Sequence, residues 1–278
     1  MSRRIKTVVA LAALVFPAIA SAQTPPPANG ILRIGREVLK PGRGSTHAKS
    51  EAAWSRALEA AKFTTTFIAF TSMSGPAEVW FVSPFASLAE MEKTNAANGA
   101  NPAFTAIDDK YDAAETDLVE SNRGMILTAR PELSYSTGKP LWQMRFLTAQ
   151  RIQVRAGHGA EFTESRVAIK AAHEKAKLAD GFAVYQVTSG MAAGTYYVFA
   201  ARSSLTELDD NAKTHQDPAY QAALGPDWAK RNAALVQAYE AQSDVNLFAV
   251  NPAMSIVPKD WKDNDAFWKP KAPAKKAP

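Results

Sequence analysis

Two glycine-flanked turns mark a pattern that occurs twice in this chain. Residues 42–44 read Gly-Arg-Gly and residues 157–159 read Gly-His-Gly, 115 residues later. Each turn follows a strand-like segment and precedes a helical one, and then come two strands rich in β-branched and aromatic residues, a second helical region and a last strand. This order predicts two copies of one supersecondary unit, strand-helix-strand-strand-helix-strand.

Counting along the chain supports an internal duplication. Phe182 lies 115 residues after Phe67, and Pro218 lies 116 residues after Pro102. Both prolines follow a residue that favours the N-cap of a helix, Asn in the first half and Asp in the second. The offset drifts only where turns are expected, and turns tolerate insertions. The alternative is a pairing of two unrelated α+β units.

The N-terminus has the three parts of a secretory signal peptide. Residues 2–6 are basic, residues 8–19 are apolar, and Ala20-Ser21-Ala22 is a small-residue cleavage site. We therefore expect a periplasmic or secreted protein, cleaved after Ala22; an uncleaved membrane anchor is the alternative. No later stretch is long and apolar enough to predict a transmembrane segment in the mature chain.

The rest of the chain divides by composition. In order, we predict a signal peptide (1–22), a Pro-rich leader (23–30), a first α+β module (31–134), a linker (135–140), a second α+β module (141–257) and a disordered tail rich in Lys, Pro and Ala (258–278).

Charge and cysteine content exclude several classes of function. The formal net charge is +5, but three positive charges lie in the signal peptide and a surplus of three lies after residue 258, so the body is near neutral. A near-neutral body is not typical of a nucleic-acid partner. The chain has no cysteine, which removes thiolate nucleophiles and Cys-type metal sites. No other metal-ligand spacing and no nucleotide-binding or hydrolase motif occurs, and no cofactor is evident.

Both faces of the predicted sheets are apolar. Phe67 and Ala69 point to one side of their strand, and Ile68 and Phe70 point to the other. Helices can cover only one of these faces, so the other requires a second sheet. We predict an α+β fold in which two ferredoxin-like modules pack sheet to sheet within one chain.

The element order, the Gly-x-Gly turn after the first strand and the duplicated form resemble the dimeric α+β barrel superfamily over about residues 30–256. This superfamily includes antibiotic-biosynthesis monooxygenases, NIPSNAP-like proteins and several haem enzymes. The resemblance implies that the two modules form an intramolecular α+β barrel, a pseudo-dimer within one chain. In this superfamily small ligands are often held between a sheet and its helices. It implies no particular reaction, because one fold hosts many functions.

Two histidines are candidates for catalysis. His47 and Glu51 lie four residues apart on the inner face of the first predicted helix, where an imidazole and a carboxylate could act together. His173 follows Ile169 by four and could point toward the second sheet, as the proximal ligand of a haem would. Each histidine also has a structural interpretation, as a helix-start residue near solvent or a partly buried side chain.

Aromatic residues could line an apolar ligand pocket, although a core role is the common one. The candidates are Trp54, Phe70, Trp80, Tyr185 and Tyr197. We therefore expect an exported protein that binds a small apolar molecule. The alternatives are a cofactor-independent monooxygenase-like enzyme that uses His47, Glu51 or His173, and a haem-binding protein.

Overall fold

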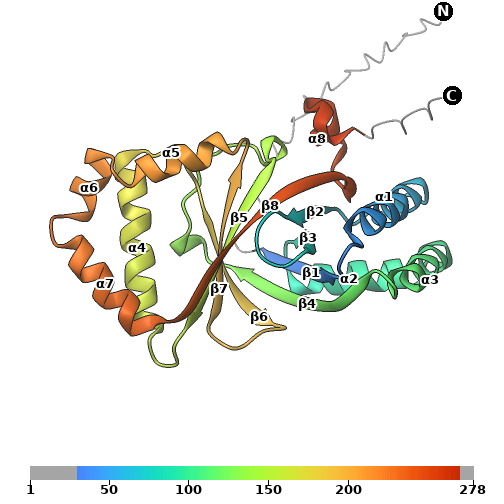
Figure 1. Ribbon diagram of the computed structural model, residues 1–278, viewed down its shortest axis with the longest axis horizontal. Coiled ribbons are helices and arrows are strands. Elements are labelled where there is room, and N and C mark those ends of the chain that lie inside the picture. The colour runs from blue at the N-terminus through green and yellow to red at the C-terminus, as the bar shows by residue number, and fades with distance from the viewer. Residues whose placement is uncertain (1–29, 270–278) are drawn as a thin grey trace, which may run out of the picture.

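A closed barrel of antiparallel strands forms the centre of the molecule, and helices flank it on two opposite sides (Figure 1). The computed structural model describes residues 30–269. The predicted signal peptide, nearly all of the leader and the last nine residues lie outside this range. No helix within the described range has the length and apolar character needed to cross a bilayer.

The elements follow the predicted order. The strands are β1 (Ile31–Leu39), β2 (Phe67–Ser72), β3 (Glu78–Phe85), β4 (Val119–Ala129), β5 (Phe146–Val154), β6 (Ala183–Ser189), β7 (Thr195–Arg202) and β8 (Glu240–Ile256). The α-helices are α1 (Gly44–Ala60), α2 (Leu88–Gly99), α3 (Pro102–Glu115), α4 (Gly159–Ala176), α5 (Thr206–Thr214), α6 (Pro218–Leu224), α7 (Trp228–Tyr239) and α8 (Lys259–Asn264). Three 3-10 turns are η1 (Pro131–Leu133), η2 (Leu141–Gln143) and η3 (Ala266–Trp268).

The barrel closes because the edges of two four-stranded sheets pair with each other. The order around the barrel is β1-β3-β2-β8-β5-β7-β6-β4. One seam joins β2 to β8, with Phe70 opposite Val250, and the other joins β4 to β6, with Leu127 opposite Val187. The halves thus meet edge to edge, and the interior of the barrel is their shared core. Closure leaves no exposed sheet edge.

The two faces of the strands are buried against different partners. Phe70 and Ile68 point into the barrel, where they join the main apolar cluster. Phe67 and Ala69 point outward and pack beneath the helices of the first half. The prediction that both faces of this strand are buried is confirmed, and residues 67–70 of β2 therefore form an unbroken apolar run.

The last strand of the first half is longer than the sequence pattern predicts. In the sequence, the spacing of apolar residues from Phe104 to Leu118 predicts a helix that ends at Gly124, but α3 ends at Glu115 and β4 begins at Val119. Leu118 lies between them. Pairing with β1 decides the boundary, because the ladder of β1 and β4 continues to Leu39 opposite Val119. Long-range pairing here outweighs local helical periodicity.

The helix starts at the two Asx-Pro pairs are confirmed. The side chain of Asn101 accepts a hydrogen bond from the backbone N–H of Ala103, at 3.0 Å. Asp217 accepts one from Ala219 at 2.8 Å and a second from Tyr220 at 3.0 Å. Each cap satisfies backbone donors that the first helical turn leaves unpaired.

The expectation of a disordered tail from residue 258 is wrong for its first part. Residues 259–268 form α8 and η3, and the side chains of Trp261 and Trp268 are buried in the main apolar cluster at one end of the barrel. Trp268 Nε1 donates a hydrogen bond to the carbonyl of Trp142, at 2.7 Å. The abundance of Lys, Pro and Ala led to the prediction of disorder. The two buried tryptophans have enough apolar area to order the segment.

We predict that Trp268→Ala lowers the free energy of unfolding by about 3–5 kcal/mol, because it removes a buried indole and leaves a cavity. Lys259→Ala is the matched control in the same segment and should change stability by less than about 0.5 kcal/mol, since its side chain is exposed. Urea unfolding measures both variants. Equal stabilities of the two variants would show that the segment is not part of the core.

Candidate functional site

A large apolar cavity occupies one end of the barrel. Its volume is about 890 Å³. The wall is made where eight strands begin or end, and the linker and α8 contribute the outer part. The side chains deepest in the barrel are apolar or aromatic: Leu32, Phe70, Met144, Leu147, Tyr185 and Phe199. A cavity of this size and character accommodates a small organic molecule.

Tyr135 and Tyr185 both line the cavity, and Tyr185 is the one that belongs to the apolar cluster inside the barrel. Burial raises the pKa of Tyr185 to about 12, so the phenol stays protonated near neutral pH. Its hydroxyl makes no hydrogen bond within residues 30–269, and it can donate one to a bound molecule.

The rim of the cavity is polar. Lys139 of the linker forms an ion pair with Glu207 on α5, and Lys139 Nζ also lies 3.1 Å from Ser203 Oγ. Burial acts to raise the pKa of Glu207, but hydrogen bonds from Lys139 and Ser203 outweigh it and hold the pKa below its ordinary value. Glu207 therefore stays ionised near neutral pH, and its ion pair with Lys139 ties the linker to α5 beside the opening.

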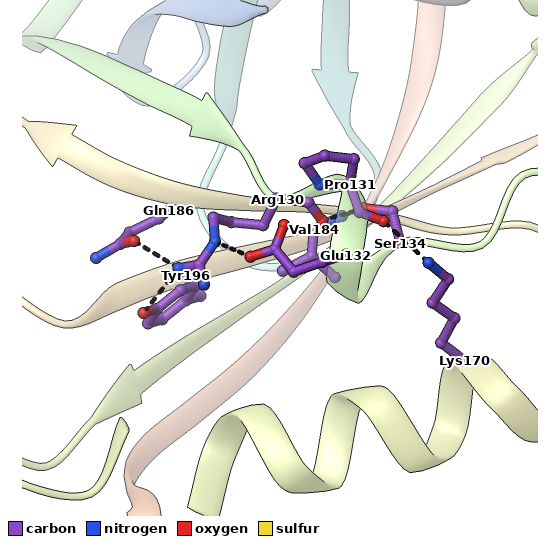
Figure 2. Close-up of polar contacts among 8 residues, drawn as sticks. All are labelled: Arg130, Pro131, Glu132, Ser134, Lys170, Val184, Gln186 and Tyr196. Carbon is purple, nitrogen blue, oxygen red and sulfur yellow. Dashed lines mark hydrogen bonds and ion pairs between the residues drawn. The ribbon is translucent and has the colours of Figure 1, made fainter. Parts of the chain in front are cut away.

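The chain between β4 and the linker forms a fixed part of the cavity wall. Figure 2 shows how this segment is held from both ends. Ser134 Oγ donates to the carbonyl of Arg130 and accepts from the backbone N–H of Val184, both at 2.8 Å. Arg130 Nη1 donates to Gln186 at 2.7 Å, and Lys170 Nζ lies 3.3 Å from the carbonyl of Pro131. Pro131 and Ser134 line the cavity, so these bonds hold this part of the cavity wall in place.

The structure divides the predicted aromatic set. Phe70 and Tyr185 line the cavity. Trp80 and Tyr197 lie in the same barrel interior, outside the cavity wall, and meet edge to face with centroids 5.6 Å apart. Trp54 lies on the other side of the sheet, where its Nε1 donates to Asp108 at 2.9 Å.

A second polar group lies outside the barrel, between β1, α1 and α3. His47 is fully buried; its Nε2 is 2.9 Å from Glu37 Oε2 and 3.5 Å from Glu115 Oε1. His47 Nδ1 and Glu115 Oε1 are buried without a hydrogen-bond partner among the described residues. A buried polar atom without a partner costs about 1–3 kcal/mol, so this group costs the fold stability. We refer to Glu37, His47, Glu51 and Glu115 as the His47 cluster.

Carboxylates crowd one another in the His47 cluster. Burial, a hydrogen bond with Glu115 and the charges of Glu115, Glu37 and Asp112 raise the pKa of Glu51 to about 10. Burial also raises the pKa of Glu37, in opposition to its hydrogen bond with His47. Glu51 is therefore protonated near neutral pH. The sequence placed His47 and Glu51 on one helix face, and the structure buries both there.

The corresponding place in the second half is apolar. At the 115-residue offset, Ile152 stands in the position of Glu37, and Phe162 in that of His47. Both are fully buried in one apolar cluster with Tyr239 and with Leu133 from η1. The two halves therefore share a framework but fill the space between sheet and helices differently.

His173 lies apart from both the cavity and the His47 cluster. Its Nδ1 donates to the carbonyl of Ile169 at 2.8 Å, one turn earlier on α4, and its Nε2 is 3.7 Å from Asp180. Its ring contacts the rings of Tyr135, Phe182 and Tyr220 at centroid distances of 5.0–5.4 Å. This packing leaves His173 inside the core of the second half, at a place that the cavity does not reach.

Sequence reasoning missed Glu37 and Glu115. Glu37 stands two residues before the buried Leu39, so strand alternation puts its carboxylate on an inward face. A charge on an apolar strand face was the available signal. Glu115 carried no such signal, because α3 is mostly exposed and only the fold brings its last residue to His47.

Comparison with solved structures places the barrel among known folds. A predicted monooxygenase of Lactobacillus acidophilus aligns with a TM-score of 0.51 at 8% identity, over 80% of this chain and 94% of its own. A predicted monooxygenase of Fusobacterium nucleatum gives 0.51 at 9% identity, over 80% and 93%. An anthrone oxidase-like protein gives 0.53 at 12% identity, over 81% and 92%. This chain has the dimeric α+β barrel fold. At these identities the likeness shows the fold alone.

No protein-family model matches the sequence, and no curated protein is similar to it in sequence.

The raised pKa of Glu51 makes stability depend on pH. The folded protein keeps a proton that the unfolded chain loses above its ordinary value of 4.5, so in metal-free buffer stability should fall as pH rises from about 4.5 toward 10. Glu51→Gln mimics the protonated acid and should remove this part of the decline. At pH 8 we expect the variant to be more stable than the wild type by about 1–3 kcal/mol in urea unfolding.

Glu92→Gln is the control for this change. Glu92 is an exposed carboxylate on α2, and its replacement should leave the pH profile of stability unchanged. Parallel profiles of wild type and Glu51→Gln between pH 5 and 9 would contradict the assignment of a buried proton to Glu51.

Proposed function

We propose that this protein binds one small apolar molecule in the cavity at the end of the barrel. The observation that carries the proposal is the cavity itself, which has a volume of about 890 Å³ and an apolar, aromatic inner wall. Covering a ligand with such a wall removes its apolar surface from water, which contributes about 25 cal/mol per Å². The wall is formed by strands of a closed barrel, so little of it has to be ordered on binding.

The polar groups suggest how a ligand is oriented. An apolar body would lie against Phe70 and Phe199, and a single polar substituent would accept a hydrogen bond from Tyr185. The Lys139–Glu207 pair stands at the opening, where it contacts solvent and the exposed end of the ligand. An aromatic or terpenoid molecule with one hydroxyl or carbonyl fits this arrangement best.

We infer that the barrel arose by tandem duplication, a reading supported by the shared element order and by the near-constant offset between the halves. We also infer that the protein acts after export, as the N-terminal sequence indicates.

A second candidate function is a cofactor-independent, monooxygenase-like enzyme. The buried pair of His47 and Glu37, at 2.9 Å, favours it because such a pair can hold an imidazole as a base. His47 does not line the cavity, so a substrate would have to lie between β1 and α1. Ligand binding therefore remains the function that the geometry supports best. Haem binding through His173 has no comparable support, since that ring is packed inside the second half.

Filling the cavity tests the proposal. Ala201 lines it, and Ala201→Trp places an indole in the space of the ligand. We expect the wild type to bind one molecule of the neutral probe N-phenyl-1-naphthylamine per chain, and the variant to bind it at least about tenfold more weakly, because part of the cavity is gone. Fluorescence titration measures both.

Ala97→Trp is the matched control, because Ala97 is exposed on α2. It should bind the probe as the wild type does. If Ala201→Trp keeps the wild-type Tm and binds the probe equally well, the cavity is not the binding site.

The hydroxyl of Tyr185 gives a finer prediction. Tyr185→Phe should weaken the binding of 1-naphthol by about 1 kcal/mol, since a neutral hydrogen bond is lost, and should leave the binding of naphthalene unchanged. Calorimetric titration with both compounds compares the two affinities in one pair of proteins. An equal loss for naphthol and naphthalene would mean that the substitution acts on packing and not on a hydrogen bond.

A further inference from the structure

Three side chains of the His47 cluster converge with the spacing of metal ligands. One donor atom from each of Glu37, His47 and Glu115 lies within 4.8 Å of the others. His47 Nε2 is 2.9 Å from the donor oxygen of Glu37 and 3.5 Å from that of Glu115. Around a cation about 2.1 Å from its ligands, neighbouring ligand atoms are about 3.0 Å apart in an octahedron and about 3.4 Å apart in a tetrahedron. We propose that these three side chains bind one divalent transition-metal cation.

The charge of the cluster favours a cation. Glu51 is hydrogen-bonded to Glu115, and the groups whose charges act on it are carboxylates, those of Glu115, Glu37 and Asp112. His47 is the one basic side chain in ion-pair contact with Glu37 or Glu115 among the described residues. A dication at the centre of the three donors compensates the surplus of negative charge that burial makes costly.

One oxygen of the cluster is left without a hydrogen bond. Glu115 Oε1 is buried, has no hydrogen-bond partner in the described part of the chain, and lies 3.5 Å from His47 Nε2. The side chain of Glu115 is 17% exposed, which gives a cation a path from solvent along α3. Glu37 has an outer contact, since Asn122 Nδ2 lies 3.4 Å from Glu37 Oε1. Such outer contacts orient metal ligands.

The second half shows that the fold does not need this polar group. Ile152 and Phe162 occupy the corresponding positions and pack as an apolar core. A chain that can fill the space between sheet and helices with apolar side chains gains no stability from burying an imidazole and carboxylates there. The first half therefore keeps the His47 cluster for a purpose other than packing.

The donor types narrow the choice of ion. An imidazole nitrogen with two carboxylates suits Zn²⁺ or Mn²⁺, whereas Mg²⁺ and Ca²⁺ prefer sets made of oxygen alone. Glu51, next to Glu115, can orient that ligand or complete the coordination. The site lies on the opposite face of β1 from the barrel cavity, so metal binding is independent of the proposed apolar ligand.

Calorimetric titration of Zn²⁺ into the metal-free full-length protein tests the proposal. We expect one Zn²⁺ per chain and a Tm that rises with Zn²⁺ concentration. Glu37→Gln keeps the shape of the side chain and removes its charge, and His47→Phe introduces the residue type that the second half carries at Phe162. Each should weaken Zn²⁺ binding by at least about 100-fold, since each removes one of three ligands. Mg²⁺ is the comparison ion and should bind far more weakly.

His158→Ala provides the matched control. His158 lies 3.1 Å from Glu161 on the surface of the second half, so its removal tests for adventitious binding at an exposed His-carboxylate pair. This variant should bind Zn²⁺ as the wild type does. Absence of stoichiometric binding in the wild type overturns the proposal, as do wild-type affinity in a folded Glu37→Gln protein and loss of binding in His158→Ala. Should His47→Phe fail to fold, Glu37→Gln alone decides.

Discussion

Closure of the barrel is the constraint on which the rest of the structure depends. Each half is a four-stranded sheet with helices on one face, and its other face is apolar and cannot be left in water. Pairing β2 with β8 and β4 with β6 turns two open sheets into one barrel and hides both faces at once. The cavity is a consequence of the same closure, because all eight strands contribute to its wall.

The two halves have the same arrangement of strands and helices, but different side chains fill the space between sheet and helices. Between sheet and helices, the second half packs Phe162 against Tyr196, with ring centroids 4.3 Å apart, and η1 adds Leu133 to the same core. The first half instead buries His47 among carboxylates. An apolar core in one half secures the fold, and the other half is free to carry a polar site whose retention costs stability.

Much of the fold could be predicted because its signals are local. The Gly-x-Gly turns, the Asx-Pro helix starts and the two-sided apolar strands define the element order without long-range information. The start of β4 at Val119 and the docking of Trp268 could not be predicted, since a partner strand and a distant core decide them. The candidate sites follow the same rule. Helical spacing brought His47 and Glu51 together, whereas Glu115 joins them only through the packing of α3 against α1.

The central claim is that the barrel cavity holds a small apolar molecule. Native mass spectrometry of the full-length protein, purified gently from the compartment in which it accumulates, tests it most directly. The account predicts a population whose mass exceeds that of the ligand-free chain by one ligand. Extraction with an organic solvent should release this ligand as a single apolar compound. A bare chain alone, together with failure to take up any apolar compound offered at saturating concentration, would contradict it.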